Sequence, residues 1–127
     1  NDGYWSNVWN NDAKGWCACY WGGRPAETMM FSAAYVAESK WNDTSWKTTD
    51  SAVKFNQLVK DARKELDENK KRDILFECQR LIYDDGGLLC PLFNSYVSAN
   101  SKKIAHGKIA ANWDSDGAKC VERWWFA

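Results

Sequence analysis

Residues 55–87, FNQLVKDARKELDENKKRDILFECQRLIYDDGG, carry the clearest folding signal in the chain. Apolar residues recur there at helical spacing on both sides of a short polar interruption, DEN at 67–69: Phe55, Leu58, Val59, Ala62 and Leu66 before it, and Ile74, Leu75, Cys78, Leu81 and Ile82 after it. Each set forms the apolar face of an amphipathic helix. The interruption is so short that the two helices are expected to form an antiparallel pair.

The ends of both predicted helices carry residues that suit helix termini. One of the three residues at 49–51 (Thr, Asp, Ser) is expected to cap the first helix, and Asn69 the second. Gly86 and Gly87 are expected to end the second helix. Charge pairs such as Glu68 with Arg72 have the i, i+4 spacing that supports a helix.

An apolar stretch precedes the helix pair. Residues 16–21, WCACYW, contain no charged or amide side chain and lie between glycines, which predicts a strand buried on both faces. It leads into a turn, GGRP, at 22–25. Residues 26–38 predict a helix, and residues 39–51 a polar loop that carries two tryptophans.

Further strand signals follow the helix pair. Residues 88–99 predict two strands with a kink at Pro91, and residues 100–112 are polar with a turn near His106. The end of the chain, CVERWWFA, predicts a buried strand or a docking tail. The pattern indicates an α/β or α+β protein with few strands. A central strand at 16–21 needs neighbours on both sides, so the sequence looks like part of a larger structure.

Composition limits the classes of function. The 17 basic and 17 acidic side chains balance in 127 residues, without the basic footprint of a nucleic-acid binder. No apolar run approaches the roughly 20 residues of a membrane-spanning helix. Nine tryptophans are the outlier, and large indole rings serve either core packing or a ligand site.

The chemically reactive residue types form no recognisable catalytic motif. We interpret the five cysteines as small buried hydrophobic residues. On a strand, Cys17 and Cys19 would have Cα atoms about 7 Å apart, at the limit for a disulfide, and too few other ligands accompany them for zinc. A pair of one of these thiols with His106 has no acid and no motif to support it. The sequence therefore predicts no enzyme, no metal and no cofactor.

Paired acidic residues have structural explanations. Asp84 and Asp85 are expected to be solvated at a helix end. Asp114 and Asp116 match the beginning of a calcium loop but lack its remaining ligands, so we expect a turn there. His106 is interpreted as a surface loop residue.

The order of these motifs resembles the C-terminal part of the family 5 extracytoplasmic solute-binding proteins of ABC importers, which include dipeptide-, oligopeptide- and nickel-binding members. The matching pieces are CACYWGGRP at 17–25, WNDTSW at 41–46, the helix pair followed by QRLIYDDGGLLCPLF at 79–93, and the closing residues 97–126. The helix pair with 79–93 is the most specific part. The resemblance covers essentially the whole chain.

The resemblance implies an α/β protein, part of the second lobe of a two-lobed periplasmic-binding-protein type II-like fold, with an antiparallel helix pair packed on a short sheet. Residues 1–112 would be the C-terminal half of that lobe, and residues 113–127 a tail that returns toward the first lobe, which is missing here. The protein would capture a small solute or peptide in the periplasm, or another extracytoplasmic space, and deliver it to a membrane permease.

The resemblance also places a ligand site. In the family the turn after the strand faces the cleft between the lobes, and peptide-binding members commonly place an aspartate there for the ligand's amino terminus. This chain has Arg24 instead, whose planar fork of donors suits carboxylate or phosphate, so the expected solute carries an anionic group. The predicted ligand-binding residues are Trp21, Gly22, Gly23, Arg24, Trp41 and Trp46.

Alternatives remain open for these residues and for the function. Arg24 can be a solvated turn residue, the two glycines can serve a turn that needs positive φ, and Trp41 and Trp46 can anchor their loop instead of lining a cleft. The tryptophans also suit an oligosaccharide-binding protein on the same scaffold. A non-catalytic interaction domain is the third reading.

Overall fold

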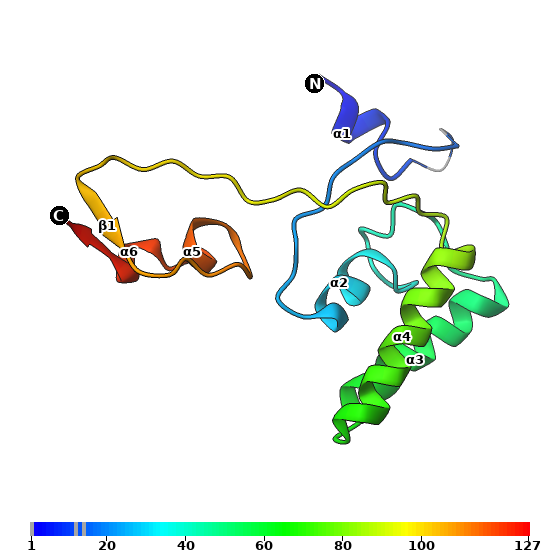
Figure 1. Ribbon diagram of the computed structural model, residues 1–127. Coiled ribbons are helices and arrows are strands. Elements are labelled where there is room, and N and C mark those ends of the chain that lie inside the picture. The colour runs from blue at the N-terminus through cyan, green and yellow to red at the C-terminus, as the bar shows by residue number, and fades with distance from the viewer. Residues whose placement is uncertain (1, 12, 14) are drawn as a thin grey trace. The chain divides into compact units, whose positions relative to one another are not determined.

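A computed structural model describes residues 2–11, 13 and 15–127. The chain divides into two compact units (Figure 1). Unit 1 comprises Asn1–Trp21 and Ala26–Leu89, and unit 2 comprises Gly22–Pro25 and Cys90–Ala127.

Unit 1 is helical among its described residues. It contains α1 (Tyr4–Asn7), α2 (Glu27–Ala34), α3 (Asp50–Lys64) and α4 (Glu68–Asp85). The predicted antiparallel pair is confirmed, because α3 and α4 pack along each other with a three-residue connection, 65–67 (Figure 1). The helix predicted over 26–38 is confirmed at its core but ends earlier, and the loop predicted over 39–51 is confirmed as far as residue 49, because α3 begins at Asp50.

The helix ends agree with the sequence at two of three positions. Thr49 caps α3, its hydroxyl accepting from the Ala52 amide at 3.2 Å. Gly86 ends α4, where a Cβ would lie 2.5 Å from the Ile82 carbonyl oxygen. The prediction of Asn69 as the second cap is wrong: the carboxylate of Asp67 accepts from two amides of the first turn, so α4 starts earlier.

The core of unit 1 lies where α2, α3, α4 and the loop before α3 meet. Phe55 is fully buried and its ring packs against Phe31 of α2 and Trp46 of the loop, with centroids 5.6 and 5.2 Å away. The other core residues are Ala34, Tyr35, Ala52, Val59, Cys78, Leu81 and Ile82. Leu66 does not join its predicted apolar face. It is 92% exposed, because α3 ends at Lys64 and Leu66 lies in the connection.

The predicted strands at 16–21 and 88–99 are not formed. Neither segment has regular secondary structure, and the exposed fractions of Trp16, Tyr20 and Phe93 are 79%, 79% and 94%. A strand requires the backbone donors and acceptors of a neighbour, and no described segment pairs with either stretch. Apolar composition alone therefore does not make these segments strands.

Unit 2 contains the one sheet of the described residues. In it β1 (Ile104–His106) pairs antiparallel with β2 (Trp124–Phe126), and His106 lies opposite Trp124. Between the strands lie α5 (Asp114–Ala118) and α6 (Cys120–Arg123). Ser115, Asp116 and Gly117 have left-handed φ/ψ values, which confirms a turn at this position rather than a regular helix.

The chain is thus a small mixed helix and sheet protein with an antiparallel helix pair and a two-stranded antiparallel sheet. The helix pair belongs to unit 1 and the sheet to unit 2. The strand alternative for the C-terminal residues is confirmed only at Trp124–Phe126, since Cys120–Arg123 are helical. That strand is not buried: Trp125 and Phe126 are 55% and 85% exposed. His106 lies on β1 rather than in a loop.

Candidate functional site

The predicted ligand-binding turn at 22–25 belongs to unit 2, and its arginine side chain donates hydrogen bonds to the backbone of the same turn. The Arg24 guanidinium donates from Nη1 to the carbonyl oxygens of Gly22, at 2.7 Å, and Gly23, at 3.2 Å. It also lies over the ring of Trp113, 5.6 Å from the centroid, within the range of a cation–π contact. Arg24 is half-buried, so its charge is held at the surface of unit 2 by backbone carbonyls and an indole face.

The two glycines of this turn do not serve a backbone conformation with positive φ. Neither has a positive φ, so the expectation of a left-handed turn is wrong. At Gly23 a Cβ would lie 2.9 Å from the Tyr96 hydroxyl, closer than real Cβ contacts. The absence of a side chain at Gly23 lets Tyr96 approach the backbone.

The three predicted tryptophans belong to unit 1. Trp41 is 55% exposed. Trp21 is half-buried against the core, with its indole N–H donating to Asp43 at 3.2 Å. Trp46 is 5% exposed and donates to Asp85 Oδ2 at 2.9 Å. These contacts favour the alternative in which Trp46 anchors its loop instead of lining a cleft.

Asp43 gathers the described N-terminal residues of unit 1 around one carboxylate. Its Oδ2 accepts from the indole N–H of Trp9 at 2.8 Å, from the Trp21 indole, and from the thiol of Cys19 at 3.3 Å. The loop that carries Asp43 is fixed by the buried side chain of Asn42, whose amide donates to three backbone carbonyls. Asn42 and Asp43 both belong to the sequence stretch WNDTSW. Nothing in that stretch predicts that Asp43 contacts residues 22–34 positions away.

The interpretation of all five cysteines as buried is corrected. Only Cys78 is buried; Cys19 and Cys90 are exposed, and Cys17 and Cys120 are half-buried. Partial burial and the hydrogen bond to Asp43 raise the pKa of the Cys19 thiol to about 12. Burial and the hydrogen bond with Cys17 likewise raise the pKa of the Tyr4 hydroxyl. These groups stay protonated at neutral pH.

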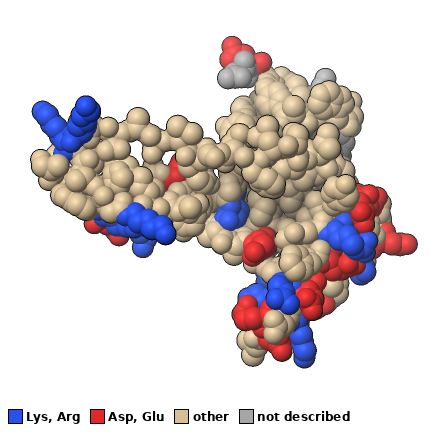
Figure 2. Space-filling model, viewed as in Figure 1, with Lys and Arg blue, Asp and Glu red and all other residues tan. Residues whose placement is uncertain are grey.

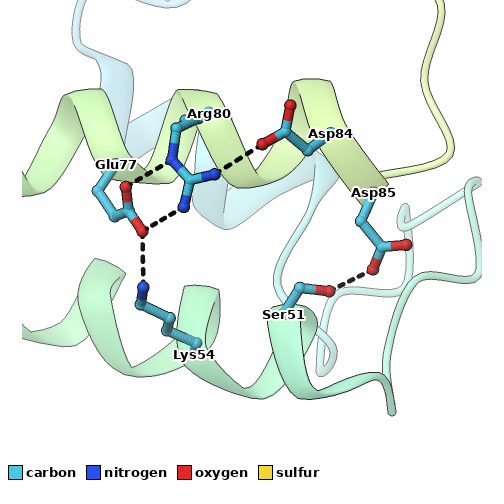
Figure 3. A network of polar contacts seen from close by, with 6 residues as sticks. All are labelled: Ser51, Lys54, Glu77, Arg80, Asp84 and Asp85. Carbon is cyan, nitrogen blue, oxygen red and sulfur yellow. Dashed lines mark hydrogen bonds and ion pairs between the residues drawn. The ribbon is translucent and has the colours of Figure 1, made fainter.

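Asp85 is exposed at the end of α4, as predicted, and it also has hydrogen-bond partners within the protein. Asp85 accepts from Trp46, from the Thr49 hydroxyl at 3.0 Å and from the Ser51 hydroxyl, and joins the end of α4 to the start of α3 (Figure 3). These hydrogen bonds, that from Ser51 first, lower its pKa. Asp84 lies on the outer side of α4 and pairs with Arg80.

A second polar network links the helices farther along. Glu77 of α4 accepts from Arg80 on its own helix and from Lys54 of α3, at 2.8 and 2.6 Å (Figure 3). The hydrogen bonds from Arg80 and then Lys54 lower the pKa of Glu77 to about 2. The expected pair of Glu68 with Arg72 is replaced, because Glu68 lies near Lys71 and Arg72 near Asp73. The network is structural, since every member has a partner on the helix pair.

Asp116 organises unit 2. It is 3% exposed and accepts from the Ala110 amide at 2.6 Å and the Trp124 indole at 2.9 Å, with Arg123 paired at 2.9 Å. The backbone hydrogen bond from Ala110 contributes most to lowering its pKa. The His106 ring packs on Trp124, 5.1 Å between centroids.

Charge is unevenly distributed along the chain. Figure 2 shows Lys, Arg, Asp and Glu gathered over the helix pair, while residues 15–23 carry no charge. Across residues 2–11, 13 and 15–127 no three His, Cys, Asp or Glu side chains gather in a way that could hold a metal. None of the helices described is long and apolar enough to cross a membrane.

Comparison with protein-family models, with curated proteins and with solved structures gave no match to this chain.

Proposed function

We propose that the chain is the C-terminal portion of the second lobe of a family 5 type solute-binding protein, which captures a small solute outside the cytoplasm for a membrane permease. The observation that carries the proposal is the exposure of apolar segments that have the composition of central strands. Residues 16–21 place Trp16 and Tyr20 at the surface, and residues 88–97 place Phe93 and Val97 there.

Exposed segments of this kind favour a sheet completed by other parts of a receptor. Isolated exposed apolar side chains are ordinary, but extended runs of them mark surfaces that another structure covers. We expect a packed helix pair with exposed apolar runs if the chain is part of a lobe whose remaining strands belong to another part of the receptor. The order of the sequence motifs is the reason for proposing this family. The antiparallel helix pair, one of those motifs, is present in the fold.

Arg24 is the proposed contact for the solute. Two of the acceptors of its hydrogen bonds, the carbonyl oxygens of Gly22 and Gly23, are neutral. A carboxylate or phosphate forms shorter and stronger charge-assisted hydrogen bonds with a guanidinium, so an anionic solute competes well for the same donors. Trp21 and Trp41 stay predicted ligand-binding residues, whereas Trp46 offers little surface to a solute.

The test is a thermal melt of the 127-residue chain with di- and tripeptides, phosphorylated sugars or neutral oligosaccharides added separately. A solute that binds the folded chain stabilises it by about 2.7 kcal/mol at a hundredfold excess over Kd. We expect a higher melting temperature with an anionic class, lost in Arg24→Ala and kept in the control Arg72→Ala, whose exposed side chain lies on α4. Absence of a shift with every class, or an equal shift in Arg24→Ala, contradicts the proposal.

Exposed indole rings favour oligosaccharide binding as a second candidate. Trp16 is 79% exposed, and Trp41 and Trp125 are each 55% exposed. Flat indole faces stack on apolar ligand faces at little entropic cost. A shift with neutral oligosaccharides that survives Arg24→Ala would select this candidate.

A further inference from the structure

The Asp43 carboxylate of unit 1 has hydrogen-bond donors at one of its two oxygens only. Its Oδ2 accepts from the indoles of Trp9 and Trp21, at 2.8 and 3.2 Å, and from the Cys19 thiol at 3.3 Å. No residue that the structure describes donates to Oδ1 or forms an ion pair with Asp43. Every buried side-chain oxygen of the described residues has a partner, so Oδ1, which has none, is open to solvent. Asp43 thus offers one acceptor oxygen, with a charge that the three neutral donors stabilise but do not cancel.

Asp43 lines an open cavity of about 120 Å³ within unit 1, and Asn10 and Trp16 belong to the same wall. The side-chain amide of Asn10 donates to the Lys40 carbonyl oxygen at 2.7 Å, so the amide oxygen of Asn10 remains as a second acceptor. An engineered cavity of about 150 Å³ in another protein binds benzene, so this cavity has room for a ligand of about four or five heavy atoms.

The chemistry of this wall selects a small cation that donates hydrogen bonds. Carboxylate and amide oxygens accept from N–H groups, and a primary ammonium group brings three of them. Trp16 is 79% exposed and adds an indole, whose π-system attracts a cation. A metal ion is disfavoured, because no three His, Cys, Asp or Glu side chains in the described part of the chain gather in a way that could hold one.

We propose that this cavity binds a small primary amine as its ammonium ion, with Asp43 Oδ1 as the charged acceptor, Asn10 as the second acceptor and the Trp16 indole beside the cation. The donors at Oδ2 already hold the carboxylate in place, so little side-chain entropy is lost when the amine binds. The site consists of unit 1 residues and does not rest on the solute contact proposed at Arg24, which favours a ligand of the opposite charge.

The experiment follows the indole N–H signals of the full chain in proton–nitrogen correlation spectra while n-propylammonium chloride is added at constant ionic strength. Trp9 and Trp21 donate to the Asp43 carboxylate, so their signals should shift as the ammonium ion binds, and the shifts give Kd. Trp46 donates to Asp85 instead, so its signal is the internal control and should stay in place. Single Trp→Phe variants assign the signals.

Variants and related ligands separate charge, hydrogen bonding and the indole. Asp43→Asn keeps an oxygen that accepts from the two indoles but removes the charge, and should weaken binding at least about tenfold. Trp16→Ala should weaken it about two- to fivefold. The control Asp84→Asn removes a unit 1 charge that already pairs with Arg80, and should leave Kd unchanged. Tetramethylammonium, which has no N–H donor, and neutral n-propanol should each bind at least about tenfold more weakly than n-propylammonium.

Four results overturn the proposal. The first is a titration in which the Trp9 and Trp21 signals move no more than that of Trp46, and the second is an unchanged Kd in Asp43→Asn. The third is equal binding of tetramethylammonium and n-propylammonium by the unchanged chain, a comparison that decides even if a variant fails to fold. The fourth is tighter binding of Nα-acetyl-lysine amide than of n-propylammonium, which would assign the cavity to a lysine side chain instead of a free amine.

Discussion

Asp85 shows how one carboxylate holds the beginning of α3 to the end of α4. It accepts hydrogen bonds from Trp46, Thr49 and Ser51, and its pKa lies below the ordinary value of 3.8 in consequence. A carboxylate whose pKa is lowered by folding contributes stability that is present above its unfolded pKa and disappears as pH falls through its folded pKa.

Asp85→Asn is therefore expected to lower the melting temperature at neutral pH, by an amount that stays constant down to about pH 4 and shrinks below it. Thermal melts of both proteins over this range measure the gap. Asp84→Asn, which removes only the outer pair with Arg80, is the matched control and should have a smaller effect. If the difference in melting temperature between Asp85→Asn and the unchanged protein does not vary with pH, the negative charge of Asp85 does not contribute to stability.

At the scale of the element, the helix pair depends on which leucines lie inside it. Leu81 of α4 is 7% exposed in the core, whereas Leu66 in the connection is 92% exposed. Leu81→Ala should cost about 2–5 kcal/mol of unfolding free energy, and Leu66→Ala should stay within about 0.5 kcal/mol. Urea unfolding followed by circular dichroism measures both. Equal losses would mean that the apolar face of the first helix extends to Leu66 after all.

The start of α4 gives a second test at this scale. Asp67→Ala removes the side chain that accepts from the Asn69 and Lys70 amides, and should cost about 1 kcal/mol. Asn69→Ala lies inside the helix, where alanine has the higher helix propensity, and should be neutral or slightly stabilising. Urea unfolding that ranks the two variants the other way would place the cap at Asn69.

The helix pair could be predicted because its information is local. Helical spacing such as that of Phe55 and Val59 predicts where the helices lie. A threonine at the start of α3 and a glycine at the end of α4 then predict two of their ends to within a few residues. The contacts of Asp43 and Asp85 could not be predicted, because the residues that donate to them lie 22–39 positions away and nothing in the sequence marks which donors a carboxylate will meet. The strand at 16–21 was predicted wrongly because its composition describes one strand and says nothing of a partner.

In the chain as a whole, residues 16–21 and 88–97 are largely apolar segments that pair with no strand among the described residues. The contrast with the packed helices is sharp: Phe55 and Cys78 are fully buried, while Trp16 and Phe93 lie at the surface. Backbone amides that take part in a packed helix exchange with solvent only when it opens, and extended amides at the surface exchange at once.

Hydrogen exchange of the chain, read by mass spectrometry of its peptides, tests this claim most directly. We expect protected amides in α3 and α4 and complete exchange in 16–21 and 88–97 at the earliest time measured. Protection of 16–21 comparable with that of α3 would contradict it, because the chain would then supply its own partner for that strand and the case for a sheet completed by a larger receptor would fail.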